Sequence, residues 1–278
     1  MQRREFLGSL AAAPQVFRSG GAPLRAGAAT AVITPPLGAS LAGYFTERFS
    51  TDNHDELLAK CVVFDNGRMR VGLVMCDLCV LPPEVAAAAK FRVAREAGVP
   101  EEGLLLAATH THSAPATMHL FQSQADPRYL DLLTDRIVDS VRMAVARLEP
   151  ARIATGFGRE GSLVFNRRFY MKPGKMPPNP FGGIDMVKMN PGVGNPDIVK
   201  EAGPVDPTVG LLAVTNAAGA PLALVGNYSL HYVGGERSGE VSADYFGYWA
   251  AAMAKHASAD RRFVAMLSNG CQGDINNV

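Results

Sequence analysis

The order of two paired strands, a helix and a third strand constrains the fold of this chain more than any other feature. Two apolar runs, 57–64 and 70–75, flank Asn66-Gly67, and Asn-Gly between such runs is a strong β-hairpin signal. Residues 84–97 are rich in alanine and contain no glycine or proline, which predicts a helix. The apolar run 103–108 follows. This order predicts a crossover unit, and therefore an α/β or mixed α+β domain.

The rest of the chain continues this mixed pattern. Asp126 and Pro127 supply the cap and first turn of a second helix. Its apolar stripe consists of Leu130, Leu133, Ile137, Val141, Ala144 and Leu148. Further apolar runs predict strands at 152–157, 208–215, 221–228 and 263–267, with a helix at 244–256. We expect mixed β-sheets with flanking helices in one large domain, 26–278. The chain ends soon after the last run, so we expect this domain to be incomplete at its C-terminus.

A long segment, 166–207, separates the two strand-rich parts. Its prolines are Pro173, Pro177, Pro178, Pro180, Pro191, Pro196, Pro204 and Pro207. A structureless loop of this length inside a domain is more often a lid or a binding loop than a linker when strand patterns resume after it. A linker is the alternative.

Charge and hydrophobicity narrow the class of partner. The 278 residues include 27 basic and 26 acidic side chains, which are interspersed and give a net charge of +1. This balance argues against nucleic acid or an anionic membrane as the partner and favours a small or neutral one. After the N-terminus, no stretch approaches the roughly 18 apolar residues of a membrane-spanning helix. The oligomeric state is left open.

The N-terminus has the pattern of an export signal. Arg3-Arg4 precedes the short apolar run 6–13, which is the layout of a twin-arginine signal, with a disordered tail as the alternative. We therefore place residues 1–25 outside the fold and expect export to the periplasm or the medium.

The cysteines do not form a convincing metal motif. Cys76 and Cys79 end an apolar run that predicts a buried strand, and residues three apart in a strand face opposite sides. No second pair lies at zinc-ribbon spacing. We interpret these cysteines, with Cys61 and Cys271, as buried free thiols rather than as a metal or redox site.

The segment Thr109-His110-Thr111-His112-Ser113-Ala114-Pro115 carries the strongest chemical signal. Two imidazoles, His110 and His112, follow the end of a predicted strand, and His231 follows another. Neutral imidazoles suit Zn²⁺. A catalytic zinc site usually has three protein ligands, so the His110–His112 pair alone does not complete a zinc site. Asp77 is a candidate for orienting a ligating histidine, with a turn or cap role as the alternative.

Several other polar residues are weaker candidates. Arg167 and Arg168, at the start of the long segment, are positioned to clamp a substrate carboxylate or carbonyl, or form a solvated basic pair. Asp244 and Asp274 follow small or polar residues at the ends of predicted elements, where a turn or cap role is at least as plausible. Among the remaining histidines, His256 is explained by the dipole of the preceding helix.

Several segments, taken in their order along the chain, resemble the N-terminal catalytic domain of the neutral/alkaline non-lysosomal ceramidases. They are residues 31–36, 109–115, 166–167, 227–231, 242–248 and 268–276. The resemblance implies a zinc-dependent amidohydrolase that cleaves the N-acyl bond of ceramide. It implies that His110 and His231 bind zinc and that His112 assists proton transfer. The Glu and Tyr that complete the family's zinc site would fall after residue 278.

One residue departs from the family pattern. Where the ceramidases have a serine in a G-[ND]-x-S-P segment, this chain has Gly273-Asp274-Ile275-Asn276-Asn277. Asn276 has no hydroxyl and is not a nucleophile, but its amide can donate a hydrogen bond to a developing oxyanion. Attack would then fall to a metal-bound water.

These observations predict a zinc-dependent amidohydrolase that acts on an N-acyl substrate, either a ceramide-like lipid or another N-acylated compound. His112 is the expected general acid/base, and Arg167 with Asn276 is expected to polarise or anchor the substrate. Two alternatives remain open: a lipid- or carbohydrate-binding homologue without turnover, and a metal-dependent esterase.

Overall fold

A computed structural model describes residues 15–16, 23–234 and 237–277. Its first sheet layer is built on the predicted hairpin. Strands β6 (Leu58–Asp65) and β7 (Arg70–Cys76) pair antiparallel, and β2 (Arg25–Val32) pairs with the other edge of β6. Helix α2 (Pro83–Ala97) then connects β7 to the parallel strand β8 (Leu104–Ala108). The predicted hairpin and crossover unit are confirmed.

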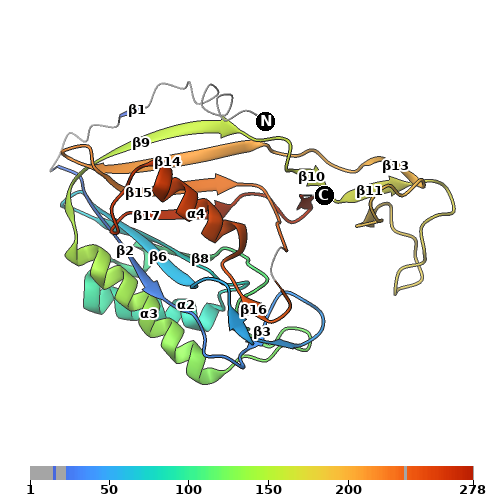
Figure 1. Ribbon diagram of the computed structural model, residues 1–278, viewed down its shortest axis with the longest axis horizontal. Helices are drawn as coiled ribbons and strands as arrows, with labels where there is room; N and C mark the ends of the chain where they lie inside the picture. The colour runs from blue at the N-terminus through green and yellow to red at the C-terminus, as the bar shows by residue number, and fades with distance from the viewer. Residues whose placement is uncertain (1–14, 17–22, 235–236, 278) are drawn as a thin grey trace.

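A second sheet layer contains the later strands. Strand β9 (Glu149–Arg159) pairs with β14 (Thr208–Asn216), which pairs with β15 (Pro221–Tyr228), and β15 pairs in parallel with β17 (Val264–Asn269). The two layers join through β2 and β9 at only two residue pairs, at the start of each strand. The sheet therefore turns back on itself, and the two layers face each other (Figure 1).

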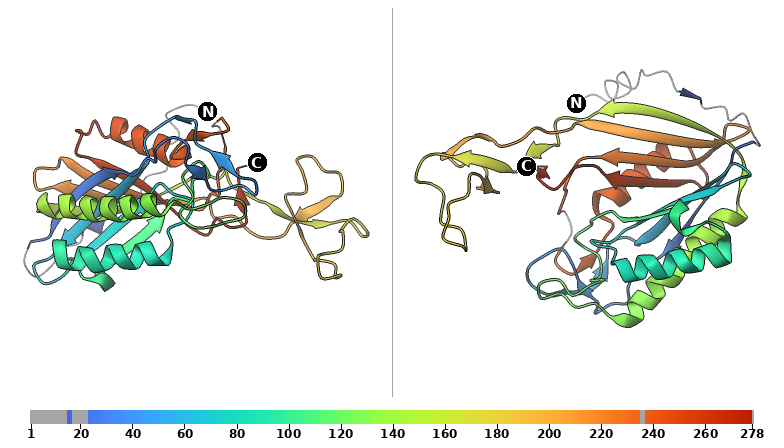
Figure 2. Two further views of the ribbon diagram at one scale, coloured as in Figure 1. Left: turned by 90° about the horizontal axis from the view of Figure 1, so that it is seen from below. Right: turned by 180° about the vertical axis from the view of Figure 1, so that it is seen from behind.

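Helices cover the outer faces of both layers. Helices α2 and α3 (Pro127–Ala146) lie on the first layer, whereas α4 (Asp244–His256) lies across β15 and β17 on the opposite side (Figures 1 and 2). The Asp126 side chain caps α3 by accepting a hydrogen bond from the Arg128 amide, as its position before Pro127 predicts. The result is a four-layer helix–sheet–sheet–helix arrangement, so the predicted mixed α+β fold class is confirmed.

The buried apolar side chains form a separate core at each layer boundary. The core between α2, α3 and the first layer includes Leu133, Ile137 and Val141 of the predicted helical stripe, all fully buried. Val62 and Met75 meet Val264 and Met266 between the two sheets. Phe246 of α4 packs with Tyr228 and Leu267 on the second sheet. Burial of both sheet faces explains why the strand patterns are continuously apolar rather than alternating.

Several short elements complete the described chain. They are β1 (Gln15–Val16), β3 (Ser40–Leu41), β4 (Arg48–Phe49), β5 (Asp52–Asn53), η1 (Glu101–Gly103), β10 (Phe165–Asn166), β16 (Glu240–Val241) and β18 (Ile275–Asn276). Strand β1 pairs with β9, although the sequence placed it outside the fold. The Arg3-Arg4 pair and the apolar run of the predicted export signal lie outside the described residues.

Residues 167–207 form an arm that projects from the body, as Figures 1 and 2 show. The expectation of a structureless segment is wrong. Strand β11 (Arg168–Met171) pairs antiparallel with both β12 (Lys188–Met189) and β13 (Ile198–Glu201) to form a small sheet. These strands have two to four residues, which is too short to produce a hydrophobic period among so many prolines. Within the part of the chain that the structure describes, no helix is long and apolar enough to span a membrane.

Candidate metal and catalytic site

Three histidines meet where the two sheet layers end on the same side. His110 and His112 follow β8 in the first layer, and His231 follows β15 in the second. The ring centroids are 4.8 Å apart for His110–His112 and 5.1 Å apart for His231 with each of the others. The structure therefore gathers the three histidines that the sequence selected into one cluster.

The backbone of the segment 76–79 fixes the orientation of His110. The His110 amide donates to the Leu78 carbonyl at 2.8 Å, and its Nδ1 lies 2.8 Å from the Cys79 carbonyl oxygen. A carbonyl only accepts, so Nδ1 donates its proton to it, and Nε2 is the ring nitrogen that faces the cluster. That Nε2 lies 3.2 Å from His112 Nε2. His110 thus directs its Nε2 into the cluster.

His112 is enclosed by the segment that precedes β4. Tyr44 packs edge-on against its ring, and Arg48 donates a 2.7 Å hydrogen bond to its main-chain carbonyl. Gly43 lies so close that an added Cβ would be 2.6 Å from His112 Cα. Burial, followed by the neighbouring imidazoles, lowers the pKa of His112 to about 3. The ring is therefore neutral at pH 7.

His231 contacts the two polar residues that the sequence assigned to the substrate. Arg167 Nη1 lies 3.2 Å from His231 Nδ1, and because a guanidinium only donates, Nδ1 accepts in this arrangement. Burial and then Arg167 lower the pKa of His231 to about 4, against a hydrogen bond with Asn276 that raises it. Arg167 and Asn276 thus lie beside the histidine cluster.

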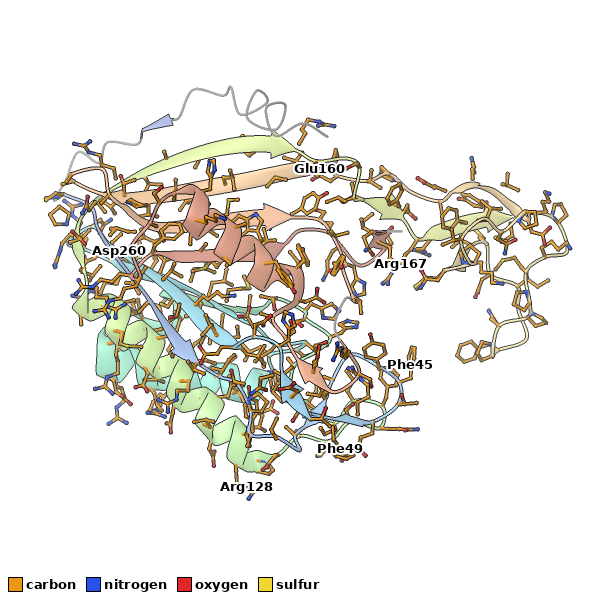
Figure 3. The ribbon with its side chains drawn as sticks, viewed as in Figure 1. Phe45, Phe49, Arg128, Glu160, Arg167 and Asp260 are labelled. Carbon is orange, nitrogen blue, oxygen red and sulfur yellow. The ribbon has the colours of Figure 1, made fainter. Side chains whose placement is uncertain are left out.

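The root of the arm is tied to the segment that carries Asn276. Strands β10 and β18 pair, with Phe165 opposite Asn276, and the Arg167 guanidinium donates to the Gly273 carbonyl. Asn166 Nδ2 donates to the Asp274 carboxylate at 3.1 Å. Figure 3 shows Arg167 at this junction. Asp274 is therefore a partner of the arm, whereas Arg168 is exposed in β11.

Asp77 was expected to orient a ligating histidine, and the structure gives it an indirect part in orienting His110. Its buried carboxylate accepts hydrogen bonds from the Leu58 amide and from Lys60 Nζ, at 3.0 and 2.7 Å, while the Cys79 carbonyl takes the ring proton of His110. Burial raises the pKa of Asp77, and the Lys60 ammonium opposes that shift. Asp77 therefore anchors the segment 76–79, which in turn orients His110. Asp244 is buried at the start of α4.

The cysteines are free thiols, but Cys79 lies closer to the cluster than the sequence suggested. Potential ligand atoms of Cys79, His110 and His112 lie within 4.8 Å of one another. Burial raises the pKa of Cys79 to about 11, so its thiol remains protonated, and only a thiolate is a good metal ligand. Cys61 and Cys76 are buried as predicted, whereas Cys271 is exposed, contrary to the prediction.

The imidazoles fit a tetrahedral zinc ion. Zinc–nitrogen bonds of about 2.0–2.1 Å in tetrahedral geometry place two ligand nitrogens about 3.3 Å apart. The 3.2 Å between the Nε2 atoms of His110 and His112 is close to that spacing, and the ring of His231, to which the resemblance assigns the second ligand, lies 5.1 Å from that of His110 between centroids. The lowered pKa values of His112 and His231 keep both rings in the neutral form that binds metals.

A cavity of about 370 Å³ opens next to this cluster at the root of the arm. Arg167 and Asn276 line it, together with the apolar side chains of Phe165, Phe169 and Ile198. A larger cavity of about 820 Å³ lies between β2 and α3 and includes none of the candidate site residues. The cavity at the arm thus joins an apolar surface to the polar residues beside His231.

Sequence reasoning missed the residues that hold the histidines in place. Gly43, Tyr44 and Arg48 enclose His112 from a segment without a strong pattern, and Asn269 donates to the main chain beside His110. Asn269 lies in 268–276, one of the segments that resemble the ceramidases. Its main-chain contact, however, depends on the approach of the two layers, which no local pattern reveals.

Comparison with known proteins identifies relatives and solved structures with a similar fold. No family model matches the chain. The neutral ceramidase of Pseudomonas aeruginosa is 26% identical over 182 residues, which is 63% of this chain and 24% of that enzyme. A crystal structure of neutral ceramidase from the same organism superimposes with a TM-score of 0.73 and 24% identity over 92% of this chain and 39% of that one. A ceramidase complexed with C2 gives 0.71 and 23% over the same shares.

The chain is therefore a divergent domain with a ceramidase-like fold, as the sequence resemblance predicted. It spans less than half of the length of the proteins it matches.

Proposed function

We propose that this protein is a zinc-dependent amidohydrolase that cleaves an N-acyl amide. The observation that carries the proposal is the cluster of three imidazoles with Arg167 and Asn276 at its edge. His110 and His231 are the proposed zinc ligands from this chain, and zinc binding at His231 would replace the hydrogen bond that its Nδ1 accepts from Arg167 in the metal-free protein. The likeness to neutral ceramidase supports the reaction class.

Each residue has a distinct chemical role in this proposal. When bound, zinc would polarise the scissile carbonyl and lower the pKa of a coordinated water to about 7. Arg167 is always charged and donates hydrogen bonds toward the substrate carbonyl, and the Asn276 amide donates to the developing oxyanion. Asn276 replaces the family serine, and its amide nitrogen is not a nucleophile, so no acyl-enzyme forms at this position.

His112 moves the proton. Its Nε2 faces the cluster, and its ring is neutral at pH 7, so it accepts the proton released during attack on the carbonyl. The protonated ring then donates this proton to the leaving amine nitrogen. Departure of a neutral amine completes cleavage of the C–N bond.

The arm cavity supports a substrate with an apolar acyl chain. A carbonyl placed near Arg167 and Asn276 has its acyl chain directed along Phe165, Phe169 and Ile198. Burial of successive methylene groups contributes about 0.8 kcal/mol each. A ceramide-like lipid therefore fits this site better than an N-acetylated sugar, whose acyl group has a single methyl.

The first experiment measures zinc content and amine release in the full-length protein. We expect bound zinc, release of amine from C12-ceramide, and a rate that rises along a C2, C6, C12 series. His110→Ala should abolish zinc binding and activity, and His256→Ala, in an exposed histidine at the end of α4, should preserve both. Zinc binding that is unaffected by His110→Ala would exclude the proposed site.

The same assay separates the alternative functions. Asn276 in place of serine favours the alternative of a lipid- or carbohydrate-binding homologue without turnover, which predicts substrate binding with no amine release. A metal-dependent esterase would hydrolyse a matched ester and leave the amide intact.

Export is a separate part of the proposal. The pair Arg3-Arg4 before a short apolar run supports secretion through the twin-arginine route. Arg3→Lys with Arg4→Lys should retain the protein in the cytoplasm of a host with that pathway, whereas unchanged export would contradict the assignment.

A further inference from the structure

Asn269, the last residue of β17, connects the two sheet layers beside the histidine cluster. Its side-chain Nδ2 donates a 2.6 Å hydrogen bond to the main-chain carbonyl of Thr109, the residue before His110. This contact joins the second layer to the end of the first. Thr109 is fully buried, so the hydrogen bond is shielded from competing water.

The conformation around this carbonyl determines where His110 points. His110 has φ of 70°, a left-handed value that costs a non-glycine residue about 1–2 kcal/mol. The first layer holds it through the Thr109 amide on the Cys76 carbonyl and the His110 amide on the Leu78 carbonyl. Asn269 holds the same turn from the layer that carries His231.

The Asn269 side chain carries a cost in folding stability. Its Oδ1 is buried without a hydrogen-bond partner among the described residues, as is the neighbouring Thr109 Oγ1. A buried polar atom without a partner costs about 1–3 kcal/mol. An apolar side chain of similar size would avoid this cost at position 269, but it would remove the Asn269 donor from the Thr109 carbonyl. Such departures from the rules of stable packing concentrate at functional sites.

We propose that Asn269 is a positioning residue that holds His110 at the distance and angle from His231 that metal binding requires. It acts through the Thr109 carbonyl and does not touch the metal or the substrate. The proposal rests on the proposed function to the extent that His110 is a zinc ligand. The hydrogen bond itself belongs to the metal-free protein.

Asn269→Leu tests the proposal because it removes the amide donor and keeps a similar volume. Zinc affinity, measured by competition with a chromophoric chelator, should fall about 10- to 100-fold, as is common when a supporting contact of a ligand is lost. The visible spectrum of the Co²⁺-loaded variant should change as well. Asn227→Leu is the matched control, since Asn227 lies on adjacent β15 and donates to the Ser268 hydroxyl, and it should retain wild-type zinc affinity.

A second measurement does not depend on metal. In the zinc-free protein with ¹⁵N-labelled histidine, the His110 Nδ1–H bonded to the Cys79 carbonyl gives an NMR signal that Asn269→Leu should shift or broaden. Asn269→Asp keeps the shape but cannot donate to Thr109, and it should have the same effect if the leucine variant fails to fold. Unchanged His110 signals and unchanged zinc affinity in a folded variant would overturn the proposal. A shifted His110 signal in a protein that binds no zinc would support the positioning role of Asn269 and contradict the proposed function.

Discussion

Gly43 shows how a single residue without a side chain controls the candidate site. Its φ of 102° is accessible to glycine, and the space where a Cβ would lie is occupied by His112. Glycine at this position therefore allows His112 to lie directly against the backbone of this segment. On the same segment, Tyr44 packs edge-on against the His112 ring, and Arg48 donates to the His112 main-chain carbonyl.

Gly43→Ala should displace His112 without removing any imidazole. We expect kcat to fall by roughly 10-fold or more while bound zinc is retained, because general acid–base catalysis contributes about 10²–10⁴-fold. Gly38→Ala is the control, since Gly38 also has positive φ, at 86°, but an added Cβ there meets nothing within 4 Å. Loss of zinc from the Gly43 variant alone would instead identify His112 as a ligand.

At the level of elements, close packing between a helix and a sheet fixes the first layer. Gly27 of β2 lies directly beneath the end of α3, where an added Cβ would lie 2.9 Å from Arg147 C and Leu148 N. The glycine lets the last turn of α3 contact the strand. The adjoining core contains the apolar stripe of that helix, so α3 and β2 cannot separate without exposing it.

Gly27→Ala should push α3 away from β2 and lower the free energy of unfolding by about 2 kcal/mol or more, as overpacking does in cores. Urea denaturation followed by circular dichroism measures the change. Gly156→Ala in β9, where a Cβ has no neighbour within 4 Å, should change it by less than about 0.5 kcal/mol. Equal effects of the two substitutions would show that loss of glycine, rather than contact with α3, is responsible.

At the level of the whole molecule, the body and the arm are distinct parts. The arm strands pair with one another, and the arm meets the body at its root, where Asn166 contacts Asp274 (Figure 3). The body contains the three cores and the histidine cluster. The arm thus contributes to the cavity wall, and its last residues, with Val205, pack on the core beside α4.

Replacing residues 173–196 with two glycines should therefore leave the body folded. The backbone supports this change, because Lys172 N and Asp197 O already form a 2.9 Å hydrogen bond across the gap. We expect Tm to change by a few degrees at most, and the preference for long acyl chains over C2 to decrease because part of the cavity wall is lost. A large fall in Tm would show that the arm stabilises the body.

Elements encoded by neighbouring residues could be predicted from the sequence, whereas contacts between distant segments could not. The hairpin at Asn66-Gly67 and the helix that begins at Pro127 were predictable because local residues encode both. The three histidines were recognised because each follows a strand. The arm sheet and the contact from Asn269 to Thr109 were not predictable, since each depends on pairing between segments with no local period.

The meeting of His110 and His231 from different layers has a consequence for folding kinetics. The two residues are 121 positions apart, and neither layer alone contains both. A newly synthesised first layer therefore has only the His110–His112 pair. Under the proposed function, high-affinity zinc binding then requires docking of the second layer. In a refolding experiment, the appearance of tight zinc binding should coincide with this late step and report on it directly.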